Sequence, residues 1–128
     1  MPDHSEHFST TELRCRCGCG QALMDADFLK KFEDLRTAYG ASMIVTSGYR
    51  CPAHNTKISH TGAHGPHTTG CAIDIKIHDA AAYKLLLLAL QFGFSGLGVS
   101  QRGPMESRFL HIDNLPHPAY PRPRVWSY

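Results

Sequence analysis

The sequence contains no long hydrophobic run. Its longest apolar stretch, Leu85 to Leu90, falls well short of the roughly 18 residues that a membrane span requires. The first ten residues are acidic and polar, without the basic and hydrophobic regions of a secretory signal peptide. We therefore expect a protein that is made in the cytoplasm without a signal peptide and that does not insert into membranes.

An excess of charge of one sign is also missing. Thirteen Lys and Arg residues face eleven Asp and Glu residues, and a formal net charge of +2 is too small to indicate a nucleic-acid-binding surface. No internal repeat is present. A chain of 128 residues with 42% hydrophobic and 19% charged residues suffices for one hydrophobic core. We expect a single domain over residues 1–128, acting as a monomer without a nucleic-acid partner.

The five cysteines lack the C-x-x-C spacing of a structural zinc site. Cys15, Cys17 and Cys19 occupy every second position instead. An odd number leaves at least one thiol unpaired. Cys51 and Cys71 flank the central loop and could approach each other, but synthesis in the cytoplasm argues against a disulfide. Small buried thiols are the simplest interpretation.

Histidine, by contrast, is abundant, with nine residues in the chain. Four of them lie between Ser47 and Asp74, at positions 54, 60, 64 and 67. This stretch ends in an H-x-x-G-x-A-x-D motif from His67 to Asp74. Residues 71–77 alternate so that three isoleucines share one strand face and Asp74 lies on the other. Because Gly70 lets the preceding turn tighten, an imidazole and a carboxylate could be fixed as two zinc ligands.

A third candidate ligand lies near the end of the chain. Residues 108–113, RFLHID, read as a short strand with His111 and Asp113 on one face. Two histidines and one aspartate, with a fourth position open to water, are the ligand set of a catalytic zinc rather than a structural one. The sequence therefore predicts one Zn²⁺ per chain, bound by His67, Asp74 and His111.

These motifs resemble a known family. SGYR at residues 47–50, the H-x-x-G-x-A-x-D motif and the late apolar-x-His are similar to those of the zinc D-Ala-D-Ala carboxypeptidases and L-Ala-D-Glu endopeptidases of peptidoglycan, especially the short phage and prophage forms. The likeness extends from the Cys-rich CRCGCG segment to RFLHID. It implies the same three zinc ligands. It also implies that Arg50 binds the substrate carbonyl or carboxylate, and it places Ser47 of the same motif among the substrate-binding residues.

The general base departs from the family pattern. Several members carry an acidic residue three positions before the last ligand, where this chain has Arg108. Asp113 is our first candidate for the base, because it lies on the same strand face as His111. Support of a zinc ligand is the alternative role for Asp113. Glu106 is the alternative base. Arg50, as the second predicted catalytic residue, would help to stabilise the oxyanion.

The resemblance implies a zinc metallopeptidase that hydrolyses peptidoglycan stem peptides. We favour L-Ala-D-Glu endopeptidase activity in cell-wall lysis, as in a phage endolysin, with D-Ala-D-Ala carboxypeptidase activity as the alternative. Phage lysis enzymes reach the cell wall through a holin pore, which would reconcile that substrate with the absence of a signal peptide. A third possibility is a non-catalytic zinc-containing cell-wall-binding module, because the hedgehog signalling domain shares the fold of this family.

Periodicity predicts an α+β fold. Asp25 and Gly40 are the expected ends of a core helix, and Asp79 is the expected N-cap of a second helix over residues 80–92 that is buried nearly all round. Further predictions cover the remaining segments: an N-terminal arm with a short strand over 1–24, strands at 43–46, 71–77, 96–100 and 108–113, a long loop at 56–69 that forms one wall of the cleft, and a Pro-rich tail without regular structure at 114–128. We expect a small, mostly antiparallel sheet with the zinc site on one face and the two helices on the other.

Overall fold

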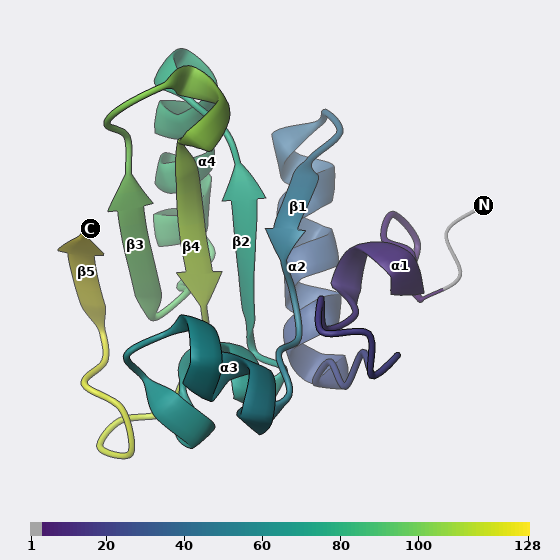
Figure 1. The fold of residues 1–128 in the computed structure, drawn as a ribbon. Coiled ribbons are helices and arrows are strands. Elements are labelled where there is room, and N and C mark those ends of the chain that lie inside the picture. The colour runs from purple at the N-terminus through teal and green to yellow at the C-terminus, as the bar shows by residue number, and fades with distance from the viewer. Residues whose placement is uncertain (1–3) are drawn as a thin grey trace.

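The computed structural model describes residues 4–128, which form one five-stranded sheet flanked by helices (Figure 1). The helices are α1 (Thr10–Leu13), α2 (Ala26–Tyr39), α3 (Pro52–Ile58) and α4 (Asp79–Gln91). The strands are β1 (Ile44–Ser47), β2 (Ala72–Lys76), β3 (Gly96–Ser100), β4 (Phe109–Asp113) and β5 (Arg124–Ser127). Short 3-10 helices span Gly62–His64, Pro66–Thr69 and Met105–Ser107. None of the helices within residues 4–128 has the length and apolar character that crossing a membrane requires.

The sheet has the strand order β1-β2-β4-β3-β5. All neighbours pair antiparallel except β3 and β5, which pair parallel. The predicted α+β fold with a mostly antiparallel sheet is confirmed. Because residues paired across neighbouring strands share a face, the register also decides which side chains meet at the site.

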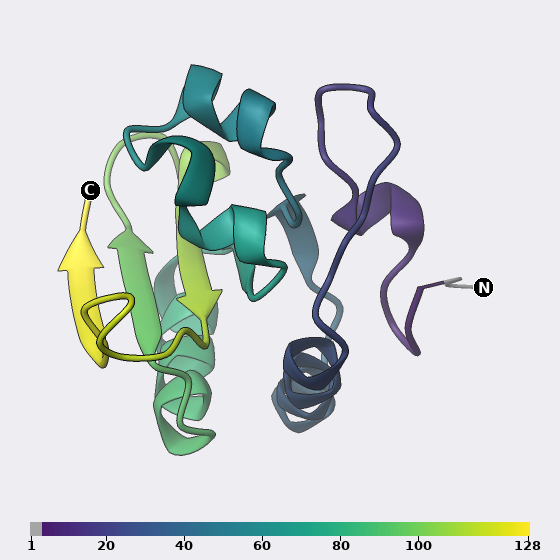
Figure 2. The ribbon, with the colours of Figure 1, turned by 90° about the horizontal axis from the view of Figure 1, so that it is seen from below.

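The two sheet faces have different coverings. Helices α2 and α4 pack on one face, and Figure 2 shows them on the opposite side of the sheet from α3 and the 3-10 helices that follow it. Ile73 and Ile75 of β2 and Ile112 of β4 are fully buried in the core under α2 and α4. Asp74 points away from that core, as the alternation predicted.

Helix α2 has the predicted ends. The Asp25 side chain accepts a hydrogen bond from the Phe28 backbone N–H at 2.9 Å, which satisfies one of the free N–H groups of the first turn. Gly40 ends the helix in the left-handed conformation with φ of 78°. Phe28 and Phe32 stack against each other in the core, so the predicted core role of this helix is confirmed.

Helix α4 is less buried than predicted. Leu85 is fully buried, but Leu87 and Leu90 are 48% and 54% exposed. The helix covers the sheet with one side only, so an apolar composition all round did not mean burial all round. His78, not Asp79, occupies its N-cap position.

Three coil predictions also need correction. In its described part, residues 4–24, the N-terminal arm contains helix α1 instead of a strand, because Ser9 and Glu12 form a reciprocal capping box. The predicted loop at 56–69 is largely helical, with the end of α3 and two 3-10 helices. The Pro-rich tail ends in strand β5, which begins after the last proline of the tail and pairs with β3. A strand that follows a proline is compatible with the rule that proline avoids strand interiors.

Candidate metal centre

Three predicted ligands meet on the sheet face opposite the core. Asp74 of β2 lies directly across from His111 of β4, and His67 lies on the 3-10 helix that leads into β2. Asp74 Oδ1 is 2.9 Å from His111 Nδ1 and 3.2 Å from His67 Nε2. All three side chains are buried, and their candidate ligand atoms lie within 4.8 Å of one another.

The outer nitrogen of each imidazole is fixed by a hydrogen bond. His67 Nδ1 donates to the Gly48 carbonyl at 2.8 Å, which leaves Nε2 facing Asp74. His111 Nε2 donates to Asp113 Oδ2 at 2.7 Å, which leaves Nδ1 facing Asp74. Such partners orient histidines in metal sites. The donor set of two imidazole nitrogens and one carboxylate oxygen fits a zinc ion with one open position.

Arg122 from the C-terminal tail holds Asp113. Its Nε donates to Oδ1 at 2.9 Å and its Nη2 to Oδ2 at 2.7 Å, so the pair is bidentate. Asp113 is fully buried, and Gly96 on β3 faces it across the strand pair. A side chain at Gly96 would collide with the Asp113 carboxylate. Trp126 and Tyr128 suggested that the tail packs back on the domain, but no local pattern singled out Arg122 as the partner of Asp113.

The electrostatic balance of the site favours ionised carboxylates. Burial raises the pKa of Asp74, but His67 and His111 outweigh it and hold that pKa well below its usual range. Burial also raises the pKa of Asp113, and His111 and Arg122 bring it below its ordinary value. Burial lowers the pKa of His111, but Asp113 and Asp74 raise it overall. Asp74 is therefore ionised at neutral pH and can serve as an anionic ligand for a cation.

Arg50 borders the same site and is held on three sides. Its Nε donates to Ser47 Oγ at 2.9 Å and its Nη1 to Asn55 Oδ1 at 3.1 Å, while its Nη2 lies 3.6 Å from Asp74 Oδ2. Ser47 is buried and does not line the pocket, so it positions Arg50 and lies away from the space open to a substrate. Asn55, also buried, was not singled out from the sequence.

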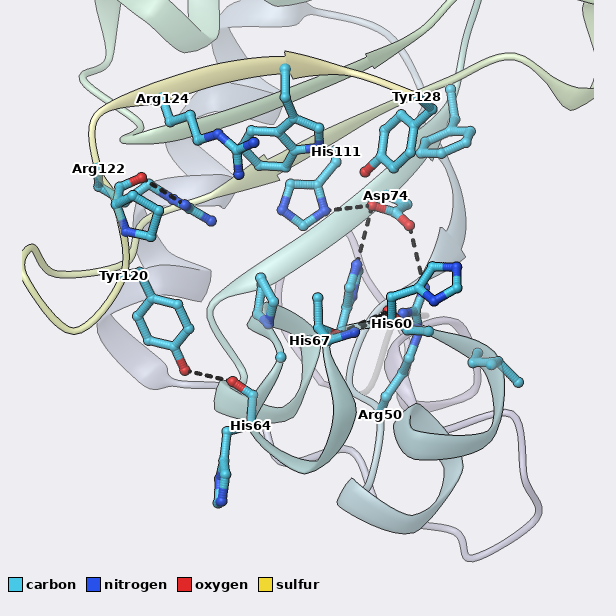
Figure 3. A pocket seen from close by; sticks show the side chains of 18 residues that line it. Arg50, His60, His64, His67, Asp74, His111, Tyr120, Arg122, Arg124 and Tyr128 are labelled. Carbon is cyan, nitrogen blue, oxygen red and sulfur yellow. Dashed lines mark hydrogen bonds and ion pairs between the residues drawn. The ribbon is translucent and has the colours of Figure 1, made fainter.

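A pocket of about 570 Å³ opens above these residues (Figure 3). One wall is the segment from α3 to His67, which includes His60 and His64, and the other is the C-terminal segment from Tyr120 to Tyr128. The Tyr120 hydroxyl donates to the His64 carbonyl at 2.9 Å and so joins the two walls at one side (Figure 3).

Trp126 forms part of the pocket wall beside His111. The two ring centroids are 5.1 Å apart. Gly98 lies between them in the β4-β3-β5 register, and a Cβ there would come within 2.8 Å of the Trp126 indole. The missing side chain at Gly98 therefore lets the tryptophan lie over the sheet and against the histidine.

The two predicted bases lie outside the pocket lining. Asp113 reaches the site only through His111, with both of its oxygens engaged. This geometry matches the alternative role, support of a ligand. Glu106 is exposed on the 3-10 helix Met105–Ser107 and does not line the pocket. Among the described residues that line the pocket, Asp74 is the sole carboxylate.

The fold and the site together define a class: a small α+β domain with a His–Asp–His cluster at the floor of a pocket on its sheet. A family model described as Peptidase M15 matches residues 6–113, and the chain belongs to this family of zinc-dependent peptidases. Neither the curated proteins nor the solved structures contain a match to it. Membership confirms the resemblance to the zinc D-Ala-D-Ala carboxypeptidase family, and it supports a peptidase that acts on peptidoglycan.

Proposed function

We propose that this protein is a zinc peptidase that hydrolyses a peptide bond of peptidoglycan stem peptides, with the L-Ala-D-Glu bond as the first choice. The observation that carries the proposal is the buried His67–Asp74–His111 cluster at the floor of a pocket that Arg50 also lines. We assign these three residues as ligands of one Zn²⁺. Asp113 then holds His111 in its binding orientation, and the Gly48 carbonyl does the same for His67.

Zinc bound by three protein ligands supplies Lewis-acid activation of a carbonyl and a coordinated water whose pKa falls to about 7. The residues of the chain hold the two histidine ligands in the orientation that zinc binding requires. His67 Nε2 and His111 Nδ1 both face Asp74, while the other nitrogen of each ring is hydrogen-bonded away from it. The bonded nitrogens keep both rings from turning away from the site.

Arg50 is suited to recognise a carboxylate or to stabilise an oxyanion. Its guanidinium lies 3.6 Å from Asp74 Oδ2, so it is beside the proposed reaction centre. Both the L-Ala-D-Glu and the D-Ala-D-Ala bond are followed by a D-residue whose α-carboxylate is free. A planar guanidinium fork matches such a carboxylate better than a lysine would. Held by Ser47 and Asn55, this fork keeps its direction before substrate arrives.

The proton acceptor lies among a small set of groups. The sequence favours Asp113, but both of its oxygens accept hydrogen bonds from His111 and Arg122. His60 and His64 line the pocket on the loop wall, and neither belongs to the proposed ligand set. Proton transfer through one of these histidines keeps the acceptor within the space that the substrate enters.

D-Ala-D-Ala carboxypeptidase activity is the second candidate. It is favoured by the hydrogen bond between Tyr120 and the His64 carbonyl, which joins the two walls at one side of the pocket. A pocket bounded at one side suits a substrate whose chain ends close to the bond that is cut. For either activity, release to the cell wall through a holin-type pore belongs to the proposal.

Mass spectrometry of purified muropeptides tests the proposal. Muropeptides ending in D-Ala-D-Ala are incubated with the protein and added zinc, with Asp74→Asn as the inactive control. Endopeptidase activity separates the stem peptide after L-Ala, whereas carboxypeptidase activity removes one alanine. Absence of any cleavage at every zinc concentration would overturn the peptidase proposal and leave a binding module.

A further inference from the structure

A second cluster of candidate metal ligands lies at the junction of the N-terminal arm and the turn after β1. It contains four of the five cysteines, and their sulfur atoms lie within 4.8 Å of one another: Cys15, Cys17, Cys19 and Cys51. Cys15 Sγ is 3.4 Å from Cys17 Sγ and 3.7 Å from Cys51 Sγ. Cys17 Sγ is 3.6 Å from Cys51 Sγ. All four thiols are free.

These separations match a metal-centred cluster better than a disulfide. A disulfide bond is about 2.05 Å long. A tetrahedral zinc with Zn–S bonds of about 2.3 Å holds its sulfurs about 3.8 Å apart. The separations among Cys15, Cys17 and Cys51, from 3.4 to 3.7 Å, lie close to the second value. Only Cys71 lies outside the cluster, so the suggested approach of Cys51 to Cys71 is replaced by an approach of Cys51 to the N-terminal arm.

The local backbone is shaped to gather the sulfurs. Gly18 and Gly20 have φ of 91° and 77°, a region that side-chain-bearing residues rarely adopt, and they let the CRCGCG segment turn sharply. The Cys51 backbone N–H donates to Cys15 Sγ at 3.3 Å. The glycine turns therefore bring together sulfur atoms from cysteines at every second position. A search for C-x-x-C spacing does not detect this arrangement.

The sulfur atoms are close enough to interact electrostatically. As thiolates, Cys15, Cys17 and Cys51 would repel one another at separations of 3.4 to 3.7 Å, and a divalent cation between them would remove that repulsion.

We propose that Cys15, Cys17, Cys19 and Cys51 bind a second, structural zinc ion as four thiolates. Four protein ligands fill a tetrahedral zinc and leave no position for water or substrate, which distinguishes this site from the His–Asp–His centre. On binding, the four thiols release their protons and no electron is transferred.

The location gives this zinc a positioning role. Cys51 directly follows Arg50, and the Tyr49 N–H donates to the Leu13 carbonyl of the N-terminal arm at 2.8 Å. Gly48, whose carbonyl orients His67, packs so closely on Leu13 that a Cβ would lie 2.7 Å from the Leu13 oxygen. A metal cross-link at Cys51 therefore clamps the arm on the turn that carries both Gly48 and Arg50.

Metal content provides the first test, with protein purified under reducing conditions. Elemental analysis should give about two zinc ions per wild-type chain and one in His111→Ala. The double variant Cys17→Ser/Cys19→Ser, which changes two exposed thiols, should also keep only one. Cys71→Ser is the matched control and should keep both. One zinc per wild-type chain, lost on changing His111, would overturn the proposal.

Cobalt substitution provides a second test. It does not require the cysteine variant, so it can be interpreted even if that variant folds poorly. Wild-type protein and His111→Ala loaded with Co²⁺ should both show strong thiolate-to-cobalt charge-transfer absorption, with the intensity of a tetrathiolate. Absence of these bands, or intact-mass evidence of a disulfide among the four cysteines, would overturn the second site. Because the readout is independent of hydrolysis, it distinguishes failure of this site from failure of the proposed peptidase activity.

Discussion

Arg122 forms two parallel hydrogen bonds with Asp113, at 2.9 and 2.7 Å, and thereby connects the C-terminal tail to the histidine at the centre of the sheet. Asp113 Oδ2 in turn accepts a hydrogen bond from His111 Nε2 at 2.7 Å, which fixes the orientation of the imidazole. Two strands and a tail segment thus converge on one imidazole ring. The proposed metal centre therefore includes a supporting residue, Arg122, that lies outside every ligand motif of the sequence.

Replacing Arg122 with glutamine should weaken both the fold and the metal centre. Removal of one partner from a buried ion pair leaves the other charge unpaired, at a cost of about 3–5 kcal/mol. Zinc affinity should fall by about 10- to 100-fold, because His111 loses its oriented support. Thermal unfolding and competition with a chromogenic chelator measure the two effects. Arg124→Gln, an exposed arginine on the same tail, is the control and should change neither.

Asp113→Asn separates support of a ligand from proton transfer. If Asp113 supports His111, zinc affinity falls by about 10- to 100-fold and hydrolysis returns at high zinc. Glu106→Gln, at the alternative base, should leave affinity and activity unchanged. Zinc titration and muropeptide hydrolysis should be followed together. Activity that stays about 10²- to 10⁴-fold low at saturating zinc would instead make Asp113 the base.

Arg50→Lys should fold and bind zinc normally but hydrolyse poorly. Lysine keeps the charge and loses the fork that Ser47 and Asn55 hold in place. We expect kcat/KM to fall by about 10²-fold, comparable to removal of one oxyanion donor. Steady-state hydrolysis of a muropeptide gives the value, and an unchanged kcat/KM would exclude a substrate role for this arginine.

His111→Ala should lose the zinc of the His–Asp–His centre. The variant retains one imidazole and one carboxylate, which leaves too few ligands for tight zinc binding. His64→Ala is the matched control, because His64 lines the same pocket outside the proposed ligand set. Elemental analysis after dialysis should show one zinc fewer than wild type in the first variant and no loss in the second. Equal zinc in both would contradict the ligand assignment.

Glu33→Gln should reduce stability at neutral pH more than at acidic pH. Burial raises the pKa of Glu33, but hydrogen bonds from Ser5 and His7 lower it below the ordinary value of 4.5. A depressed carboxyl pKa stabilises the fold above 4.5, and this contribution is lost as the pH falls through the folded value. Hydrogen bonds to a charged group contribute about 1.5–3 kcal/mol each. Thermal unfolding should show the gap from wild type closing well below pH 4.5. Asp34→Asn, which changes an exposed carboxylate of the same helix, is the control for the substitution itself.

The sequence predicted the parts of the site that belong to strands and motifs. Alternation around Asp74 and His111 placed both side chains on one face, and the register confirms that they lie opposite each other. Helix α2 was predictable because Asp25 and Gly40 are local signals that act within one turn.

The rest depended on contacts between distant segments. No local pattern links Arg122 to Asp113, or Cys51 to Cys15, because each pair forms only when the chain returns to the sheet or the turn. The tail was predicted to lack regular structure from its prolines, yet β5 begins after the last of them. Burial of α4 was overestimated because composition does not reveal how much of a helix the sheet covers.

The parallel pairing of β5 with β3 also matters for solubility. Strand β3 would be an edge strand without it, and the open hydrogen-bonding groups of an edge are a template for pairing with another molecule. With β5 in place, the outer strand is short and carries the exposed Arg124. Release of this strand would therefore do more than weaken the support of Asp113. It would also leave the edge of β3 open to pair with a strand of another molecule, and the protein would then self-associate.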